Sequence, residues 1–556
     1  MEVSTTATPA AALPLRRPRL WRGCLLLCAA ILSLPVLVIV GSLAGGYSPA
    51  WGHLVDTVLA DYVVNSLLLM LGVGVGTFVL GVSAAWLTAM CEFPGRRLFS
   101  WALLLPMAMP AYIIAYTYTG MLDYAGPVQS LLRESFGWGY GDYWFPRIRS
   151  LGGAICMLSL VLYPYVYLLV RVAFSEQSTA VLEASRSLGK TPWQTLFLVA
   201  LPMARPAIAA GISLALMETL ADYGTVAYFG VSAFTTGIFR TWYGLGELQT
   251  AAQLAAFLLL FVFALFALGR YSRLRLRFHP ASARQESRRI QLRGARAALC
   301  TLLALAIVSA GFILPALQLA SWAFDDPARA LEAPFLDLVG NSFMLAAMAA
   351  LCCLFLALLL GYGRRLHPGR LETVAVRVSS MGYAVPGTVI AVGVLIPFAW
   401  LDNGIDSLAR EWLGVSTGLL LSGSLAALVF AYVVRFLSVA LQSVESGLGR
   451  IRPALDESAR SLGHSPTQVL RRVHLPMLRG SLLTALLLVF VDVLKELPTT
   501  LILRPFNFST LAVRAHELAS DERLADAALP ALAIVLIGLL PVILMTRNLS
   551  RGDNNA

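Results

Sequence analysis

Long apolar runs, rather than short periodic patches, organise this chain. Each run covers about 20 residues, which is enough to cross the roughly 30 Å hydrocarbon core of a bilayer as a helix. We predict spans near residues 23–44, 62–90, 98–121, 150–174, 206–229, 252–269, 296–321, 338–362, 379–401, 417–441, 480–503 and 526–545. The pattern predicts an all-α polytopic membrane protein with about 12 transmembrane helices.

The first run could be a signal peptide or an anchor, because Arg16, Arg17, Arg19 and Arg22 precede it or begin it. A basic start of this kind precedes signal peptides as well. The run is long, and no clear small-x-small cleavage site follows it. We therefore expect the helix to remain as a membrane anchor.

Composition supports a membrane protein and explains the charge. The 556 residues are 58% hydrophobic and 13% charged, whereas soluble domains carry about 25% charged residues. The net charge of +11 comes almost wholly from arginine, since Lys190 and Lys495 are the only lysines. The arginines crowd into alternate connections, above all 270–296 and 363–378, as the positive-inside rule requires. We expect both termini and the 270–296 linker in the cytoplasm, and no nucleic-acid partner.

The seven cysteines offer little chemistry. None forms a C-x-x-C pair or stands at ligand spacing from a histidine, and all lie within or beside apolar runs: Cys24, Cys28, Cys91, Cys156, Cys300, Cys352 and Cys353. Small polarisable core residues fit this placement better than metal ligands or disulfides.

The two halves of the sequence repeat each other. Residues 182–194 read L-E-A-S-R-S-L-G-K-T-P-W-Q, and residues 456–468 read D-E-S-A-R-S-L-G-H-S-P-T-Q, 274 positions later. The dipeptide Asn65-Ser66 recurs as Asn341-Ser342. We predict two parallel six-helix halves, residues 1–269 and 297–556, joined by the arginine-rich linker 270–296. Parallel repeats of this kind place the transport pathway between them.

The first copy of the repeated segment contains G-K-T, as a phosphate-binding loop does. Ala184 stands where such a loop has its first glycine, and the second copy reads G-H-S. A phosphate loop also follows a buried strand, whereas this segment is a polar connection between spans. We therefore expect no nucleotide site here.

Both copies instead predict a helix–turn–helix. Gly189 can end the first helix in the left-handed conformation, and Thr191 with Gln194 forms a capping box at the start of the next helix. The second copy repeats these signals with Gly463, Ser465 and Gln468. The sequence thus predicts a rigid two-helix elbow on each half.

The motifs E-A-S-x-x-x-G and E-S-A-x-x-x-G, each followed by L-P, resemble the EAA loop of ABC importer permeases. The resemblance implies the type I permease fold, no catalysis by this chain, and ATP acting through two cytoplasmic ATPase subunits, with no cofactor bound here. It assigns EAA loops to about 178–205 and 451–479. The ATPase-coupling residues that it implies are Glu183, Ala184, Gly189, Glu457, Ser458 and Gly463.

Nearly the whole chain resembles the fused iron(III) permeases that work with a ferric-binding periplasmic protein. Stretches such as K-E-L-P-T-T-L-I-L-R-P-F-N-F carry this resemblance. It implies a bacterial inner-membrane location, ferric iron as substrate, and a binding protein docking on outer loops 122–149, 230–251 and 504–525. Permeases for thiamine, polyamines, phosphonates or sulfate share the architecture, so these substrates stay open. A secondary transporter would also use parallel repeats, but it would not need two elbows. An embedded enzyme is disfavoured, because no nucleophile–base pair and no H-E-x-x-H stands in the sequence.

Four acids in the spans bear on the substrate independently of any resemblance. Glu218 and Asp222 recur 274 positions later as Asp492 and Glu496, and the i, i+4 spacing would put each pair on one helix face. A charge in mid-membrane costs at least about 2.5 kcal/mol.

One interpretation makes these acids a pathway for a hard cation, with transient iron(III) contact at Asp222 and Glu496 and no stable metal. Phenol oxygens of Tyr112, Tyr116, Tyr163 and Tyr223 would lie nearby. The other interpretation is structural: the acids cap broken helix ends or pair with Lys495 and arginines. The sequence leaves both open.

Overall fold

The computed structural model describes residues 19–139, 141–177, 185, 187–274, 289–325 and 327–554. Within these ranges, eleven helices are long and apolar enough to cross a membrane. A further pair, Arg96–Ala108 and Ala111–Phe136, passes the same test together but is bent by 93°. The predicted all-α polytopic fold is therefore confirmed.

The first half of the chain folds into the following elements, in order: α1 (Arg19–Gly41), η1 (Ser42–Ala44), α2 (Pro49–Thr57), α3 (Leu59–Met90), β1 (Cys91–Glu92), α4 (Arg96–Ala102), η2 (Leu105–Ala108), α5 (Ala111–Leu122), α6 (Pro127–Phe136), α7 (Leu151–Ser175), α9 (Pro192–Thr195), η3 (Leu196–Ala200), α10 (Leu201–Ala221), α11 (Gly224–Tyr228), α12 (Phe234–Leu245) and α13 (Leu248–Leu274).

The second half follows the same plan: β2 (Ile290–Gln291), α14 (Ala295–Val308), η4 (Ser309–Ile313), α15 (Leu314–Phe324), η5 (Pro327–Leu331), α16 (Ala333–Leu366), α17 (Arg370–Ser379), η6 (Ser380–Ala384), α18 (Gly387–Leu413), α19 (Leu425–Gly449), α20 (Pro453–Ser461), α21 (Pro466–Val469), η7 (Leu470–His474), α22 (Leu475–Leu494), α23 (Pro498–Leu503), α24 (Leu511–Ser520) and α25 (Leu524–Asn554).

The sequence repeat is a repeat of structure. Helices α7 and α19 begin 274 residues apart, at Leu151 and Leu425, and the same offset separates Pro192 of α9 from Pro466 of α21. The repeated Asn-Ser dipeptide has a common task. Asn65 donates a hydrogen bond to the carbonyl of Ser232 (2.9 Å), and Asn341 donates to that of Ser509 (3.4 Å). Each asparagine thereby ties the chain just before α12 or α24 to a long span.

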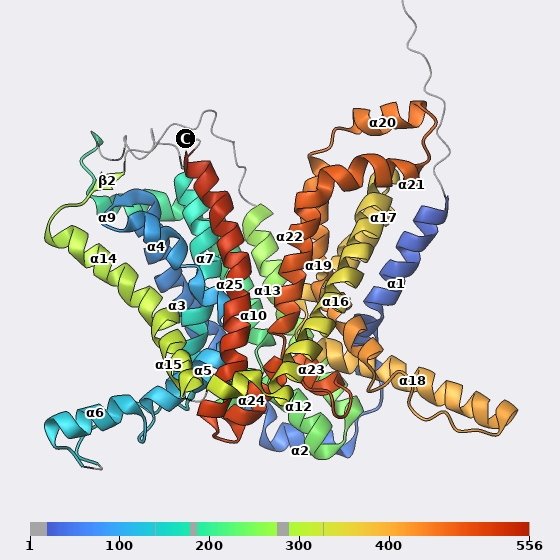
Figure 1. The fold of residues 1–556 in the computed structure, drawn as a ribbon, viewed down its shortest axis with the longest axis horizontal. Helices are drawn as coiled ribbons and strands as arrows, with labels where there is room; N and C mark the ends of the chain where they lie inside the picture. The colour runs from blue at the N-terminus through green and yellow to red at the C-terminus, as the bar shows by residue number, and fades with distance from the viewer. Residues whose placement is uncertain are drawn as a thin grey trace, which may run out of the picture.

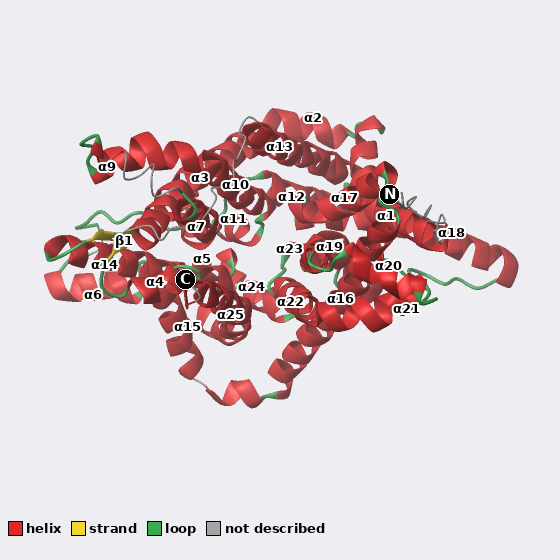
Figure 2. Ribbon diagram, turned by 90° about the horizontal axis from the view of Figure 1, so that it is seen from above, coloured by secondary structure: helices red, strands yellow, loops and turns green. Residues whose placement is uncertain are grey.

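The two halves interlock instead of forming separate bodies. Helix α1 of the first half packs against α16, α17 and α18 of the second, while α14 and α15 reach α4 and α5 of the first. In the view of Figure 2, α1 accordingly lies beside α17 and α18, and α15 lies beside α25. The strand β2 pairs in parallel with β1, with Cys91 opposite Ile290. The two halves therefore pack against each other and are not units that pack alone.

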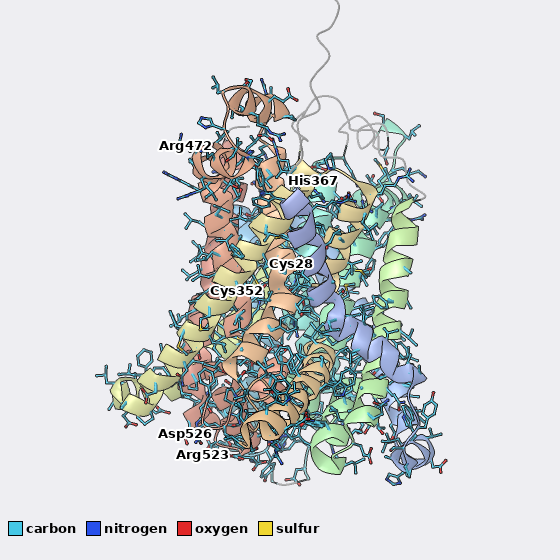
Figure 3. The ribbon with its side chains drawn as sticks, turned by 90° about the vertical axis from the view of Figure 1, so that its right-hand side faces the viewer. Cys28, Cys352, His367, Arg472, Arg523 and Asp526 are labelled. Atoms are coloured by element: carbon cyan, nitrogen blue, oxygen red, sulfur yellow. The ribbon has the colours of Figure 1, made fainter. Side chains whose placement is uncertain are left out.

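The elbows and the long spans define the two ends of the molecule. Figure 1 shows α9, α20 and α21 at one end, together with the C-terminal end of the chain, and α2, α6, α12 and α24 at the opposite end. We call these the elbow end and the far end. Figure 3 places Arg472 at the elbow end and Arg523 with Asp526 at the far end.

Between the two ends the surface is apolar, as a bilayer requires. Cys28 on α1 and Cys352 on α16 lie in this region (Figure 3). Leu27 on α1 and Phe355 on α16 are 61% and 66% exposed. Exposed apolar residues in such numbers mark a lipid-facing surface. Among the cysteines, Cys91 and Cys353 are buried.

Four spans that the sequence predicts as continuous are broken in the structure, which corrects that prediction. The spans at 98–121 and 379–401 are interrupted just before Pro110 and Pro386, after which α5 and α18 begin. Proline lacks the N–H group that a continuing helix would use. The spans at 206–229 and 480–503 stop at Ala221 and Leu494, and short helices α11 and α23 follow. Pro110, Gly224 and Pro498, at three of these breaks, line one cavity.

Candidate functional site

The second elbow has the predicted geometry. Helix α20 ends at Ser461, and Gly463 follows with a φ of 84°, the left-handed conformation that glycine adopts without strain. The backbone N–H of Gln468 donates to Ser465 Oγ (3.3 Å), and the backbone N–H of Ser465 donates to Gln468 Oε1 (2.8 Å). The predicted capping box is therefore confirmed. Glu457 and Ser458 are exposed on α20.

The first elbow shows the same turn where the structure describes it. Gly189 has a φ of 77°, and Thr191 and Gln194 exchange the two bonds of the capping box at 3.3 and 3.0 Å. Glu183 and Ala184 lie outside the described residues. One prediction needs correction: the second helix of each elbow is not separate, because α9 continues through η3 into α10, and α21 through η7 into α22. A force on either elbow therefore acts directly on a span.

Each elbow also presents an apolar side chain that the sequence prediction missed. Leu188 and Leu462, each directly before the turn glycine, are 79% exposed. An exposed large apolar residue at the same place in both copies is a mark of an interaction surface. The signal was present in the sequence as the shared S-L-G.

The second elbow is fastened to the bundle by a charged network. The Arg365 guanidinium at the end of α16 lies 2.7 Å from Asp456 and donates to the carbonyls of Leu448 and Ile451. His474 Nε2 lies 2.8 Å from the other oxygen of Asp456. Two spans thus hold the start of α20 in place.

The four intramembrane acids meet in one cavity between the halves. It has a volume of about 140 Å³ and is lined from both halves. Its charged and hydroxyl-bearing lining consists of Glu218, Asp222, Tyr112, Tyr165, Tyr223, Tyr383, Arg435, Asp492, Lys495 and Glu496. The structure therefore brings together the four acids and Tyr223, which the sequence suggested for a substrate pathway.

In the second half, both acids have a cationic partner. Arg435 Nη1 lies 3.0 Å from Glu496 Oε1, with side chains 11% and 2% exposed. Lys495 Nζ lies 2.9 Å from Asp492 Oδ1. Glu496 also accepts hydrogen bonds from the backbone N–H groups of Thr499 and Thr500, at 3.1 and 3.2 Å, at the start of α23.

In the first half, Asp222 plays the same capping part without a cation. It accepts hydrogen bonds from the N–H groups of Thr225 and Val226 at 3.0 and 3.2 Å, and from Thr225 Oγ1 at 3.0 Å. An unsatisfied backbone N–H inside a bilayer costs several kcal/mol, so the carboxylate allows the chain to break there. Glu218 lines the same cavity from α10.

The acids do not share a helix face in the way the spacing suggested. Glu218 is on α10, but Asp222 follows its last residue in an extended conformation. Glu496 likewise lies beyond α22, which carries Asp492. The pairs converge on the cavity because the helix ends between them.

The tyrosine prediction is half right. Tyr112 and Tyr223 line the cavity. Tyr163 instead donates to the carbonyl of Leu103 (2.9 Å) and Tyr116 to that of Ala527 (3.5 Å), and neither lines the cavity.

Other cavity residues were missed. Tyr165 and Tyr383 line it, as does Arg435, which was visible in the sequence as a lone arginine in an apolar run.

Further aromatic rings lie beside Tyr112 and Tyr223, which line the cavity. The ring of His516, on α24, lies 6.4 Å from the ring of Tyr112 and 6.0 Å from that of Tyr223. Phe239 lies 4.6 Å beyond Tyr223. Burial lowers the pKa of His516 to about 4, so this ring is neutral at pH 7 and adds no charge to the cluster.

Among the described residues, no group of three or more His, Cys, Asp or Glu side chains is arranged to hold a metal ion.

A repeated helical bundle with a charged cavity between its halves and an elbow continuous with a span on each half defines the class of protein, a membrane permease. Residues 77–278 and 353–552 each match the family described as "Binding-protein-dependent transport system inner membrane component". The matches cover more than half of the chain, and the chain belongs to this family. It is the inner-membrane permease of an ABC importer, and membership implies an ATPase and a substrate-binding protein as partners. The secondary-transporter alternative is thereby set aside.

Relatives of this chain differ in how much of it they share. The chain is 26% identical over 548 residues to the Fe(3+)-transport system permease protein FbpB 2 of Haemophilus influenzae, covering 96% of this chain and 99% of that protein. It is 26% identical to the molybdenum transport system permease protein ModB of Escherichia coli, over 33% of this chain and 72% of ModB. The sulfate transport system permease protein CysT of E. coli is 28% identical over 37% of this chain and 71% of CysT.

Proposed function

We propose that this permease imports ferric iron, delivered by a ferric-binding protein on the far side of the membrane. The carrying observation is the cavity, where four carboxylates face two cationic side chains. Excess negative charge in a low-dielectric site attracts a cation and repels an oxyanion. The full-length likeness to a permease named for Fe(3+) transport supports the same substrate.

The likeness to molybdenum and sulfate permeases concerns about a third of the chain, and it reflects the common fold. Among the alternatives that the sequence left open, phosphonate is disfavoured by the same charge argument. Thiamine and polyamines are cations and remain the competing substrates. Iron(III) is favoured over them because carboxylate and phenol oxygens surround the cavity, and hard cations prefer oxygen ligands.

Import follows from alternating access. In this proposal the elbow end faces the cytoplasm with both termini, and each elbow contacts one of two ATPase subunits. ATP binding draws the ATPases and elbows together, and the spans α10 and α22 move because the elbows continue into them. Transport results only if the substrate binds the two states with different free energies.

Iron uptake tests the proposal directly. Cells that express the chain with its partners under iron limitation are expected to accumulate radiolabelled iron(III), and cells lacking the chain should lose this uptake. Excess thiamine or putrescine should leave uptake unchanged if iron is the substrate. Competition by either compound, or uptake independent of the chain, would contradict ferric import while leaving the permease assignment intact.

The elbows should be required for ATPase binding. Reversing charge in both copies, Glu183→Lys with Glu457→Lys, is expected to lower ATPase recovery on co-purification about tenfold, an effect of about 1.4 kcal/mol. The matched control reverses one exposed far-end glutamate in each half, Glu134→Lys with Glu411→Lys. The control should recover the ATPase normally. Equal recovery for both double variants would remove the elbows from the interface.

A further inference from the structure

The two walls of the central cavity differ in charge although the acids are related by the repeat. The second-half acids are paired with Arg435 and Lys495. At the repeat-related positions, 274 residues earlier, the first half has Val161 and Ala221, and both line the cavity. The first-half wall therefore carries the net negative charge.

Glu218 is the acid least committed to the fold. Glu218 makes no hydrogen bond or ion pair with another described residue, whereas Asp222 caps α11 and Glu496 caps α23 and binds Arg435. The charge of Glu218 acts on Lys495 of the second half as well as on the phenols of Tyr165 and Tyr383, and all three residues line the same cavity.

A buried phenol supplies a second, independent sign of a ligand. Tyr112 is 5% exposed and lines the cavity, yet its hydroxyl has no hydrogen-bond partner among the described residues. A buried hydroxyl without a partner costs free energy, and such a group in a native structure needs an explanation. One explanation is that this phenol oxygen contacts a cation in transit.

We propose that Glu218, with Asp222 and the phenol oxygen of Tyr112, forms the transit contact for a hard, multiply charged cation, and that the first half alone supplies it. The identity of the cation as iron(III) rests on the proposed function. Asp222 also caps α11, so the three oxygens do not form a closed coordination shell. A pathway requires such an open contact, because a tightly held ion could not leave. Asp492 and Glu496 serve the fold through their ion pairs.

Terbium(III), a hard trivalent cation whose luminescence is sensitised by nearby aromatic rings, probes this contact without transport. We would titrate it into the purified full-length permease. Glu218→Gln is expected to lower the affinity for terbium, measured from the saturable luminescence, about tenfold. The control, Glu445→Gln, removes an acid that lies outside the cavity and should leave terbium binding unchanged. Asp492→Asn, at the repeat-related acid, should weaken binding less than Glu218→Gln, and an equal loss would overturn the one-sided contact. Tyr112→Phe keeps the ring and should weaken binding without removing the acids.

The outcomes separate this inference from the proposed function. Equal loss in Glu218→Gln and in Asp492→Asn, or no loss in either, overturns the one-sided contact even if iron uptake is normal. A greater loss in Glu218→Gln than in Asp492→Asn, with a loss in Tyr112→Phe, supports the contact. If wild-type cells then fail to take up iron(III), ferric import fails and the cation contact stands. Gel filtration of each variant tests whether a lost signal comes from a misfolded chain.

Discussion

Replacing Arg435 by leucine is expected to destabilise the folded permease by about 3–5 kcal/mol, because it leaves Glu496 as a buried charge without a cation. The Glu496 side chain is 2% exposed, so water cannot substitute for the guanidinium. Thermal unfolding of the purified protein should show a lower midpoint temperature. Gel filtration of the same protein should show aggregation.

A second substitution should rescue this variant. Arg435→Leu with Glu496→Gln removes both charges, and a pair replaced together is often tolerated. The repeat-related Val161 shows that an apolar residue fits this place in the fold. A double variant as unstable as the single one would mean that Arg435 acts through something other than Glu496. A side chain in place of Gly387 would test the same ion pair, since its Cβ would meet the side chains of both Arg435 and Glu496.

Arg365→Met is expected to separate ATP hydrolysis from transport. Without the guanidinium, Asp456 and the carbonyls at the end of α19 lose their common partner, and α20 is no longer fixed to α16. Hydrogen bonds to charged groups contribute about 1.5–3 kcal/mol each. In proteoliposomes with both partners, uptake should fall about tenfold or more while hydrolysis persists.

The neighbouring arginine provides the control for this experiment. Arg364 pairs with Glu445 at 3.0 Å, where both side chains are more exposed, 36% and 26%. Exposed ion pairs contribute about 0–1 kcal/mol, so Arg364→Met should transport nearly normally. If Arg365→Met lowers hydrolysis and uptake in parallel, the network supports folding of the elbow rather than coupling.

Local chemistry made much of this structure predictable. The apolar runs, the repeat, the left-handed glycines and both capping boxes depend on residues within a few positions of one another. The breaks at Asp222 and Glu496 were also signalled locally, by Gly224 and Pro498. The structural interpretation of the acids included such broken helix ends, but the predicted spans ran through them, because an apolar run long enough to span a membrane outweighed a single helix-breaking residue.

Tertiary pairing set the remaining features. Arg435 lies 61 residues from Glu496 in sequence, and no local pattern shows that a lone arginine in one span neutralises an acid in another. The spacing of Glu218 and Asp222 suggested a shared face of one helix, but the pair converges through a helix end. The placement of α1 against the second half also depends on packing between distant segments.

The interlocking of the halves has a consequence for stoichiometry. A permease assembled from two copies of the first half would double the unpaired acids in its cavity, and one assembled from two second halves would have none. Joining both halves in one chain, with α1 packed on the second half and α14 on the first, yields one wall of each kind in every molecule. Covalent linkage thus fixes the direction of the electric field across the pathway, which a pair of separately made subunits would have to secure by choosing the right partner.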